Sequence, residues 1–102
     1  MMGYYRMGKA DIVGAFDGNN LIGYAQFFQK ENGRLHLNQI AVRENWQGKG
    51  VGTLLLEAVK TGAQECGSNM VELFCNENNS VAKDFYHKHR FVTEKRLMIR
   101  ML

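Results

Sequence analysis

The chain of 102 residues is long enough for a single domain, residues 1–102, whose core needs no disulfide framework. Hydrophobic residues make up 45% of it, but no apolar run reaches the length of a membrane span, so we expect no membrane partner. The N-terminus lacks the apolar stretch of a signal peptide, which predicts the cytoplasm.

The charge and the cysteines narrow the expected ligands. A net charge of +3 indicates a mild preference for anionic partners. The excess is small, and no strand interleaves aromatic and basic residues, so we do not expect a nucleic acid; a small phosphate-bearing ligand suits the charge equally well. Cys66 and Cys75 have no metal-ligand spacing, and we expect no metal.

The first half of the chain predicts an antiparallel meander. Three segments bounded by the turn signals DGNN and ENG have strand-like composition: 11–16, 21–30 and 34–42. In the third segment Leu35 and Leu37 alternate with His36 and Asn38. Because strand side chains alternate between faces, this pattern predicts one buried and one polar face.

The second half predicts two helices and at least two more strands. Five apolar residues from position 51 fall at helical spacing, namely Val51, Leu54, Leu55, Ala58 and Val59. Gly67 is the expected end of that helix, residues 70–75 read as a strand, and Asn78 or Asn79 caps a second helix. Residues 91–102 close the chain as one or two strands. This order predicts an α/β class of fold, with a mixed α+β sheet and one parallel pairing.

Three glycines precede the first helix, at positions 48, 50 and 52. The first amides of a helix lack internal partners and carry the positive end of the dipole, so a pyrophosphate can bind there. Glycine removes side chains that would hinder its approach, and Lys49 adds a positive charge. A plain glycine-rich turn fits the same residues. The chain has no Gly-Lys-Ser/Thr, and the preceding antiparallel strand argues against a dinucleotide fingerprint.

The segment IAVRENWQGKGVGTLLLEAVK resembles the acetyl-CoA-binding segment of the GNAT acetyltransferase superfamily. The family pattern Arg/Gln-x-x-Gly-x-Gly/Ala is matched from Gln47 to Gly52, and a second pattern, Asn-x-x-Ala-x-x-Phe-Tyr, from Asn79 to Tyr86. The resemblance covers roughly residues 10–102. It implies a GNAT-like acyl-CoA N-acyltransferase fold with strand order β-β-β-α-β-α-β(β), truncated at the N-terminus.

The resemblance also implies a cofactor site, with acetyl-CoA as the acetyl donor. The pyrophosphate is expected on the backbone amides of seven consecutive residues: Gln47, Gly48, Lys49, Gly50, Val51, Gly52 and Thr53. The pantetheine arm is expected to pair with a splayed strand edge at Ile40, Ala41 and Val42, where an amide would polarise the thioester carbonyl. Three further contacts come from the second pattern, namely Asn79, Ala82 and Phe85.

Two residues are implied as catalytic. Tyr86 would protonate the departing CoA thiolate, because a thiolate leaving group benefits from a positioned proton donor. His36 lies eleven positions before Gln47, where one branch of the family carries its catalytic glutamate. An imidazole can accept the proton of an ammonium group near neutral pH. A chain of water molecules, with His36 as an ordinary strand residue, remains an equal alternative.

Two departures from the family pattern affect the expectations. Only about ten residues precede the first predicted strand, where the family usually has a strand and two helices. A homodimer with the acceptor site near its interface would cover the exposed sheet. Arg90 replaces the usual glycine and must adopt a glycine-like turn. The expected function is N-acetylation of a small-molecule or peptide amine; the alternative is a non-catalytic acyl-CoA-binding module or a fragment that needs a partner subunit.

Overall fold

The computed structural model describes residues 2–7, 10–76, 78–94 and 97–102. The strands are β1 (Met2–Met7), β2 (Ala10–Asp17), β3 (Asn20–Gln29), β4 (Leu35–Val42), β5 (Met70–Phe74), β6 (Val92–Glu94) and β7 (Leu97–Met101). The helices are a short 3-10 turn, η1 (Glu44–Trp46), and two α-helices, α1 (Val51–Glu65) and α2 (Ser80–Lys88). The predicted meander and both predicted α-helices are therefore confirmed. Strand β1 and η1 are additions that the sequence pattern did not indicate.

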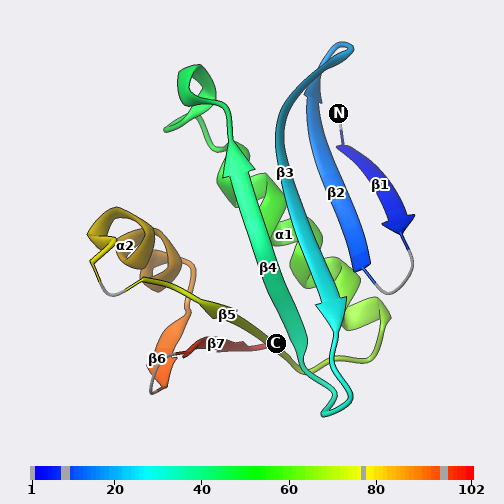
Figure 1. Ribbon diagram of the computed structural model, residues 1–102, viewed down its shortest axis with the longest axis vertical. Helices are drawn as coiled ribbons and strands as arrows, with labels where there is room; N and C mark the ends of the chain where they lie inside the picture. The colour runs from blue at the N-terminus through cyan, green and yellow to red at the C-terminus, as the bar shows by residue number, and fades with distance from the viewer. Residues whose placement is uncertain (1, 8–9, 77, 95–96) are drawn as a thin grey trace.

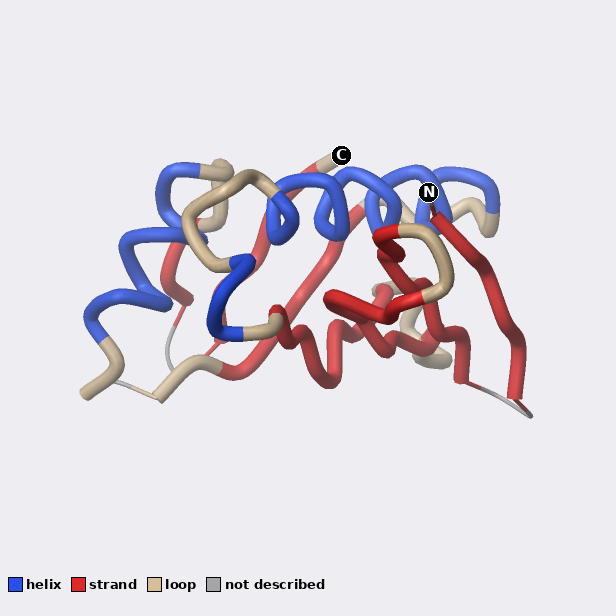
Figure 2. Tube along the Cα trace, turned by 90° about the horizontal axis from the view of Figure 1, so that it is seen from above, coloured by secondary structure: helices blue, strands red, loops and turns tan. Residues whose placement is uncertain are grey.

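The strands form one mixed sheet in the order β1-β2-β3-β4-β5-β7-β6 (Figure 1). All neighbours pair antiparallel except β4 and β5, which are parallel, as the intervening helix predicted. Figure 2 shows α1 along one face of the sheet, with α2 beside the strands at one end. The fold is thus two-layered in the described part of the chain, with α1 covering one sheet face.

The core lies between α1 and the sheet. Leu55, Val59 and Ala63 lie about one helical turn apart, and each has 1% or less of its surface exposed. They pack in one cluster with strand residues such as Ala25 and Phe27. A methyl group added at Gly62 would lie 3.3 Å from the ring of Phe27, so the helix approaches the sheet closely there. This packing fixes where the N-terminal end of α1 lies relative to β4.

A β-bulge in β4 sets up the site. Gln26 pairs with Gln39 and Phe27 pairs with Leu37, so Asn38 is an extra residue in β4. Simple alternation from Leu35 and Leu37 would put residue 39 on the core side of the sheet. Because of the bulge, Ile40 packs against the core instead. A bulge bends its strand and increases the local twist. The predicted alternation therefore holds only up to residue 38.

The parallel pairing ends just before the bulge. Only Leu35 with Val71 and His36 with Glu72 are paired between β4 and β5. Figure 1 shows the two strands together where β4 begins and diverging toward the end of β4 that leads into η1. The backbone edge from Ile40 to Val42 that faces β5 consequently has no partner strand in the described part of the chain. The splay expected from the family resemblance is present.

Two chain reversals follow their predictions. Gly67 adopts a left-handed φ of 78° directly after α1, as expected of a residue that ends a helix. Arg90, which follows α2, adopts a φ of 71° and is the one non-glycine residue with positive φ among those described. The substitution for glycine thus keeps the turn, at a cost of about 1 kcal/mol in backbone strain. Both cysteines are free.

Candidate active site

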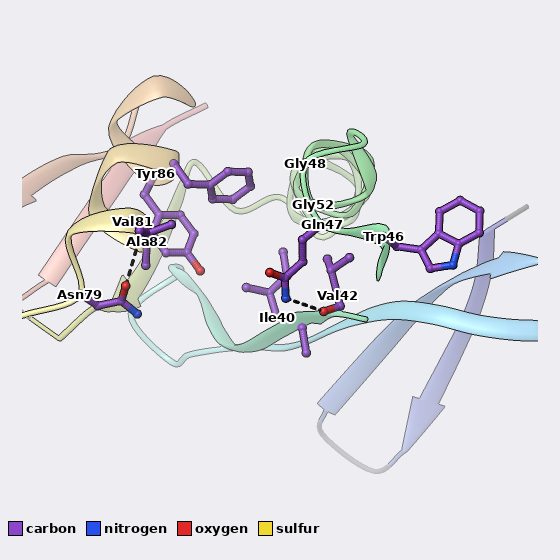
Figure 3. A pocket seen from close by; sticks show the side chains of 12 residues that line it. Ile40, Val42, Trp46, Gln47, Gly48, Gly52, Asn79, Val81, Ala82 and Tyr86 are labelled. Atoms are coloured by element: carbon purple, nitrogen blue, oxygen red, sulfur yellow. Dashed lines mark hydrogen bonds between the residues drawn. The ribbon is translucent and has the colours of Figure 1, made fainter. Parts of the chain in front are cut away.

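The glycine turn, the splayed edge of β4 and the start of α2 enclose a pocket of about 340 Å³, here called the loop pocket (Figure 3). Its size lies in the range typical of small-molecule sites. It is lined by Ile40, Ala41, Val42, Trp46, Gln47, Gly48, Gly52, Asn79, Val81, Ala82, Phe85 and Tyr86. All of these except Trp46 and Val81 are site residues predicted from the sequence. The two predicted motifs, far apart in the chain, therefore face one another across a single cavity.

The glycine turn presents backbone rather than side chains. Gly48 and Gly50 have φ values of 77° and 87°, in the left-handed region that favours glycine. Gly50 is the N-cap of α1 and supplies no side-chain cap, and the first turn of the helix has no acidic residue. The first amides of α1 are therefore left to an external acceptor, at the positive end of a 15-residue helix. Such a helix start suits an anion.

Gly52 has a different reason to be glycine. Its φ is not left-handed, but a methyl group there would lie 3.0 Å from the ring of Phe85. The missing side chain thus allows α2 to pack closely against the start of α1. Next to it, the Thr53 hydroxyl lies 2.9 Å from Nε2 of His89, whose Nδ1 donates to the carbonyl of Phe85 at 2.8 Å. These contacts hold the two helices together at the pocket.

Several predicted cofactor residues lie near the loop pocket without lining it. Lys49 extends over the indole ring of Trp46, with Nζ 5.3 Å from the ring centroid. The side chain of Val51 is buried in the core, so only its backbone faces the turn. Gln47 does line the pocket and its Nε2 donates to the carbonyl oxygen of Val42 at 3.0 Å (Figure 3). That bond ties the turn to the splayed edge of β4.

Tyr86 lies between the loop pocket and a second one. The second cavity, here called the strand-gap pocket, has about 290 Å³ and lies between β4 and β5. It is lined by Leu37, Asn38, Gln39, Ile40, Leu73, Phe74, Cys75, Asn76, Asn79, Ala82 and Tyr86. The two pockets share Ile40, Asn79, Ala82 and Tyr86, so they adjoin along the splay. An elongated ligand can extend from the glycine turn into the gap between the strands.

The Tyr86 hydroxyl is available to a ligand in this passage. Figure 3 shows it directed from α2 toward β4. The residue is 8% exposed, and its hydroxyl has no hydrogen-bond partner among the described residues. Burial, with a smaller contribution from nearby Cys75, raises the pKa of Tyr86 to about 12. The phenol therefore keeps its proton at neutral pH and can donate it.

Asn79 combines two roles. Its Oδ1 accepts a hydrogen bond from the amide of Ala82 at 3.1 Å, which is the N-cap of α2 that the sequence predicted. The amide nitrogen Nδ2 makes no hydrogen bond to the described residues, and the Asn79 side chain lines both pockets. The cap fixes the side chain, and the remaining donor faces the cavity.

His36 is buried, although the alternation of residues 35–38 predicted that its side chain lies on a polar face of the sheet. The residue is 7% exposed, and its ring lies 5.2 Å from the ring centroids of both Phe28 and Phe74. It lines neither pocket, although Phe74 borders the strand-gap pocket. Its Nδ1 lies 2.7 Å from Oε2 of Glu72, so the two side chains are hydrogen-bonded. The structure thus places the predicted base beside the passage and not in its lining.

Glu72 is a residue that the sequence reasoning missed. Its carboxylate is 1% exposed and accepts from Lys30 Nζ at 3.2 Å, with Arg34 at 3.6 Å. Burial would raise the pKa of Glu72, but hydrogen bonds from His36 and Lys30 outweigh it and hold the pKa below its usual value of 4.5. A charged residue inside the apolar strand MVELF was the available signal, but its partners depend on the sheet register.

The lowered pKa of Glu72 predicts an acid-dependent loss of stability. The Glu72 carboxylate binds a proton more tightly in the unfolded chain than in the folded one. Its contribution to the free energy of unfolding is therefore complete above pH 4.5 and is lost as the pH falls below that value. Urea unfolding between about pH 7 and about pH 3 should show wild type losing its advantage over Glu72→Gln as the pH drops. A difference in unfolding free energy that stays constant with pH would contradict this explanation.

Two other kinds of site can be assessed in the described part of the chain. None of its helices combines the length and apolar character required to cross a bilayer. Within the same residues, no three His, Cys, Asp or Glu side chains come together in a way that could hold a metal ion.

Comparison with known proteins gives a family match. The sequence matches the family model described as the acetyltransferase (GNAT) family over residues 4–91. No curated protein has a sequence that matches the chain.

Solved structures with low sequence identity have the same fold. The PaiA N-acetyltransferase of Thermoplasma acidophilum, in complex with coenzyme A, is 22% identical with a TM-score of 0.84, over 92% of this chain and 62% of that one. A putative streptothricin acetyltransferase of Bacillus anthracis, in complex with acetyl coenzyme A, is 22% identical with a TM-score of 0.90, over 97% and 66%. Ard1 of Thermoplasma volcanium is 20% identical with a TM-score of 0.81, over 92% and 70%. The chain thus spans less than two thirds of the first two proteins.

Proposed function

Because the chain belongs to the GNAT acetyltransferase family, whose model matches residues 4–91, we propose that it transfers an acetyl group from acetyl-CoA to a primary amine by direct attack. One observation carries the proposal: the loop pocket and the strand-gap pocket adjoin, and together they lead from the start of α1 to Tyr86. Coenzyme A or acetyl-CoA is bound in two of the structures that share the fold. The predicted compartment remains the cytoplasm.

The residues of the passage suit the parts of acetyl-CoA in order. The backbone from Gln47 to Thr53 would hold the pyrophosphate, because the N-cap Gly50 leaves the first amides of α1 without a side-chain acceptor. Lys49, over the nearby indole, would add positive charge. The unpaired edge from Ile40 to Val42 would pair with the amides of the pantetheine arm, and Ala82 and Phe85 would pack against it.

The chemistry then needs one proton donor and one acceptor. A neutral amine attacks the thioester carbonyl, the carbon–sulfur bond breaks, and the electron pair leaves on the sulfur of CoA. Tyr86 would donate its proton to that thiolate, since the phenol is protonated at neutral pH and its hydroxyl is directed toward β4. A backbone amide on the edge of β4 would stabilise the oxyanion. His36 would accept the proton that the amine nitrogen loses as it bonds to the carbonyl carbon, and a water chain remains the alternative.

Release of CoA thiol from acetyl-CoA in the presence of a mixed panel of primary amines tests the proposed function. We expect thiol release above the rate of spontaneous hydrolysis with at least one class of small-molecule or peptide amine. The acetylated product should be identified by its mass. Saturable acetyl-CoA binding without thiol release across the panel would contradict the enzymatic function and favour a non-catalytic acyl-CoA-binding module.

Asn79 offers a test of pantetheine binding that is separate from folding. Asn79→Asp keeps the oxygen that caps α2 but removes the Nδ2 donor, so we expect weaker acetyl-CoA binding with stability nearly unchanged. Asn79→Ala removes the cap as well and should also cost about 1 kcal/mol of unfolding free energy. Calorimetric affinity and thermal unfolding measure the two effects. Equal affinity of Asn79→Asp and wild type would leave Asn79 only its capping role.

We further propose a homodimer with the acceptor site near its interface. The sheet face that carries His36 lies opposite α1 and presents Phe28 and the 68% exposed Phe74. Burial of this aromatic surface by a second copy would stabilise the assembly. Sedimentation should give a dimer at micromolar concentration. A monomer under those conditions would contradict the proposal.

A further inference from the structure

We propose that Glu72 is a positioning residue that holds His36 with its proton on Nδ1, so that Nε2 is the atom that accepts the proton from the attacking amine. The inference rests on the proposed acetyl transfer and deepens it, since it assigns the base a fixed tautomer. It is carried by the hydrogen bond between His36 Nδ1 and Glu72 Oε2 at 2.7 Å.

The bond determines which nitrogen carries the proton. A carboxylate can only accept a hydrogen bond, so Nδ1 of His36 must donate to it. In a neutral imidazole the other nitrogen, Nε2, then holds a lone pair and no proton. Nε2 is therefore a proton acceptor, as a general base requires.

Glu72 remains an anion because of its other neighbours. Lys30 Nζ lies 3.3 Å from Oε1 and 3.2 Å from Oε2, and Arg34 approaches Oε1 at 3.6 Å. Both cations come from the β3–β4 hairpin, on the same sheet face as His36. A carboxylate that is 1% exposed and has these partners does not take the proton from Nδ1. The anion thus orients the imidazole and stabilises the imidazolium that forms during proton transfer.

The ring of His36 is also fixed in place. It lies between Phe28 and Phe74, with both ring centroids at 5.2 Å, so the side chain has no room to reorient freely. Nε2 makes no hydrogen bond to the described residues. Among those residues, no fully buried polar side-chain atom lacks a partner, so Nε2 is not fully buried. Since His36 is 7% exposed, we assign that exposed part of the ring to Nε2, at the gap between the two aromatic side chains.

This position is next to the reaction site. His36 is the last residue of β4 that pairs with β5, and the next residue, Leu37, already lines the strand-gap pocket. Phe74, which contacts the His36 ring, also lines that pocket. His36 does not line this pocket itself, so an amine bound there would reach it past Phe74, whereas Tyr86 lines the pocket from α2.

Nitrogen-detected NMR of the imidazole at a pH where His36 is neutral tests the tautomer without any substrate. We expect the Nδ1–H form in wild type and in Glu72→Gln, whose amide oxygen can still accept, but the Nε2–H form in Glu72→Val. Glu57→Val is the matched control, because it makes the same substitution at an exposed carboxylate of α1 that lines neither pocket. A wild-type Nε2–H form, or the same tautomer in Glu72→Val, would overturn the inference.

Thiol-release kinetics on the same variants test the role in catalysis. We expect kcat of Glu72→Val to fall about 100-fold with an unchanged Kd for acetyl-CoA, a smaller fall in Glu72→Gln, and wild-type kcat in Glu57→Val. A tautomer that changes without an effect on kcat would overturn the positioning role and leave the acetyl transfer intact. Absence of thiol release in wild type would instead overturn the proposed function, and with it the role of His36 as a base.

Discussion

Replacement of Tyr86 by phenylalanine is expected to lower kcat by a factor of about 10²–10⁴, with little effect on the affinity for acetyl-CoA. The hydroxyl is the only part removed, and it makes no hydrogen bond to the described residues. The ring keeps its edge contacts with Phe85 and Phe91, at centroid distances of 5.3 Å and 5.5 Å. The variant should therefore fold normally, and the loss should be confined to protonation of the leaving thiolate.

A second tyrosine provides the control for this substitution. Tyr24 is half-buried on β3 and lines neither the loop pocket nor the strand-gap pocket, so Tyr24→Phe should keep wild-type kcat. Steady-state thiol release with saturating acetyl-CoA measures both variants. Wild-type kcat in Tyr86→Phe would return Tyr86 to a packing role, and a loss confined to acetyl-CoA affinity would make it a binding residue.

Replacement of Gly48 by valine is expected to weaken acetyl-CoA binding about 100-fold. Gly48 has a φ of 77°, where a β-branched residue is strained, and it lines the loop pocket. If the turn changes conformation to relieve that strain, the amides of the helix start lose their arrangement. A loss of about 3 kcal/mol of binding free energy corresponds to a roughly 100-fold weaker affinity.

The chain offers a closely matched control for that strain. Gly67, at the other end of α1, has a φ of 78°, and a methyl group there meets nothing within 4 Å, as at Gly48. Gly67→Val should therefore lose a similar unfolding free energy, about 1–2 kcal/mol, but keep its affinity for acetyl-CoA. Thermal unfolding and calorimetry of both variants separate strain from binding. Equal affinities of Gly48→Val and Gly67→Val for acetyl-CoA would contradict a direct role for the glycine turn.

The sequence was informative where local chemistry decides the structure. The cap at Asn79, the left-handed turn at Gly67 and the glycine-like conformation of Arg90 all depend on a few neighbouring residues. The two motifs that enclose the loop pocket could be found for the same reason. Each is a short pattern whose residues lie on one turn or one helix face.

The β-bulge was only partly predictable. Alternation correctly predicted a common face for Leu35 and Leu37, but the two adjacent polar residues Asn38 and Gln39 interrupt it before Ile40. That interruption was a readable signal of an extra residue in the strand. The length of the pairing between β4 and β5, and hence the width of the splay, depends on packing of α1 against the sheet and was not in the local pattern.

The Glu72 cluster could not be predicted from the sequence. His36 and Glu72 are 36 residues apart, and their bond depends on the parallel register of β4 and β5. The same holds for β1, whose six residues gain their strand conformation from antiparallel pairing with β2. Both are products of non-local contacts. The predicted exposure of the His36 face was wrong at His36 because aromatic neighbours from β3 and β5 cover the ring.

The most direct test of the central claim is a calorimetric titration of the wild-type protein with acetyl-CoA. The passage from the start of α1 to Tyr86 predicts saturable binding of one molecule per chain. Affinity should be weakened in Gly48→Val and retained in Tyr86→Phe, because only the first variant alters the glycine turn. A titration that stays flat at millimolar acetyl-CoA would contradict the proposed site and the acetyl transfer that depends on it.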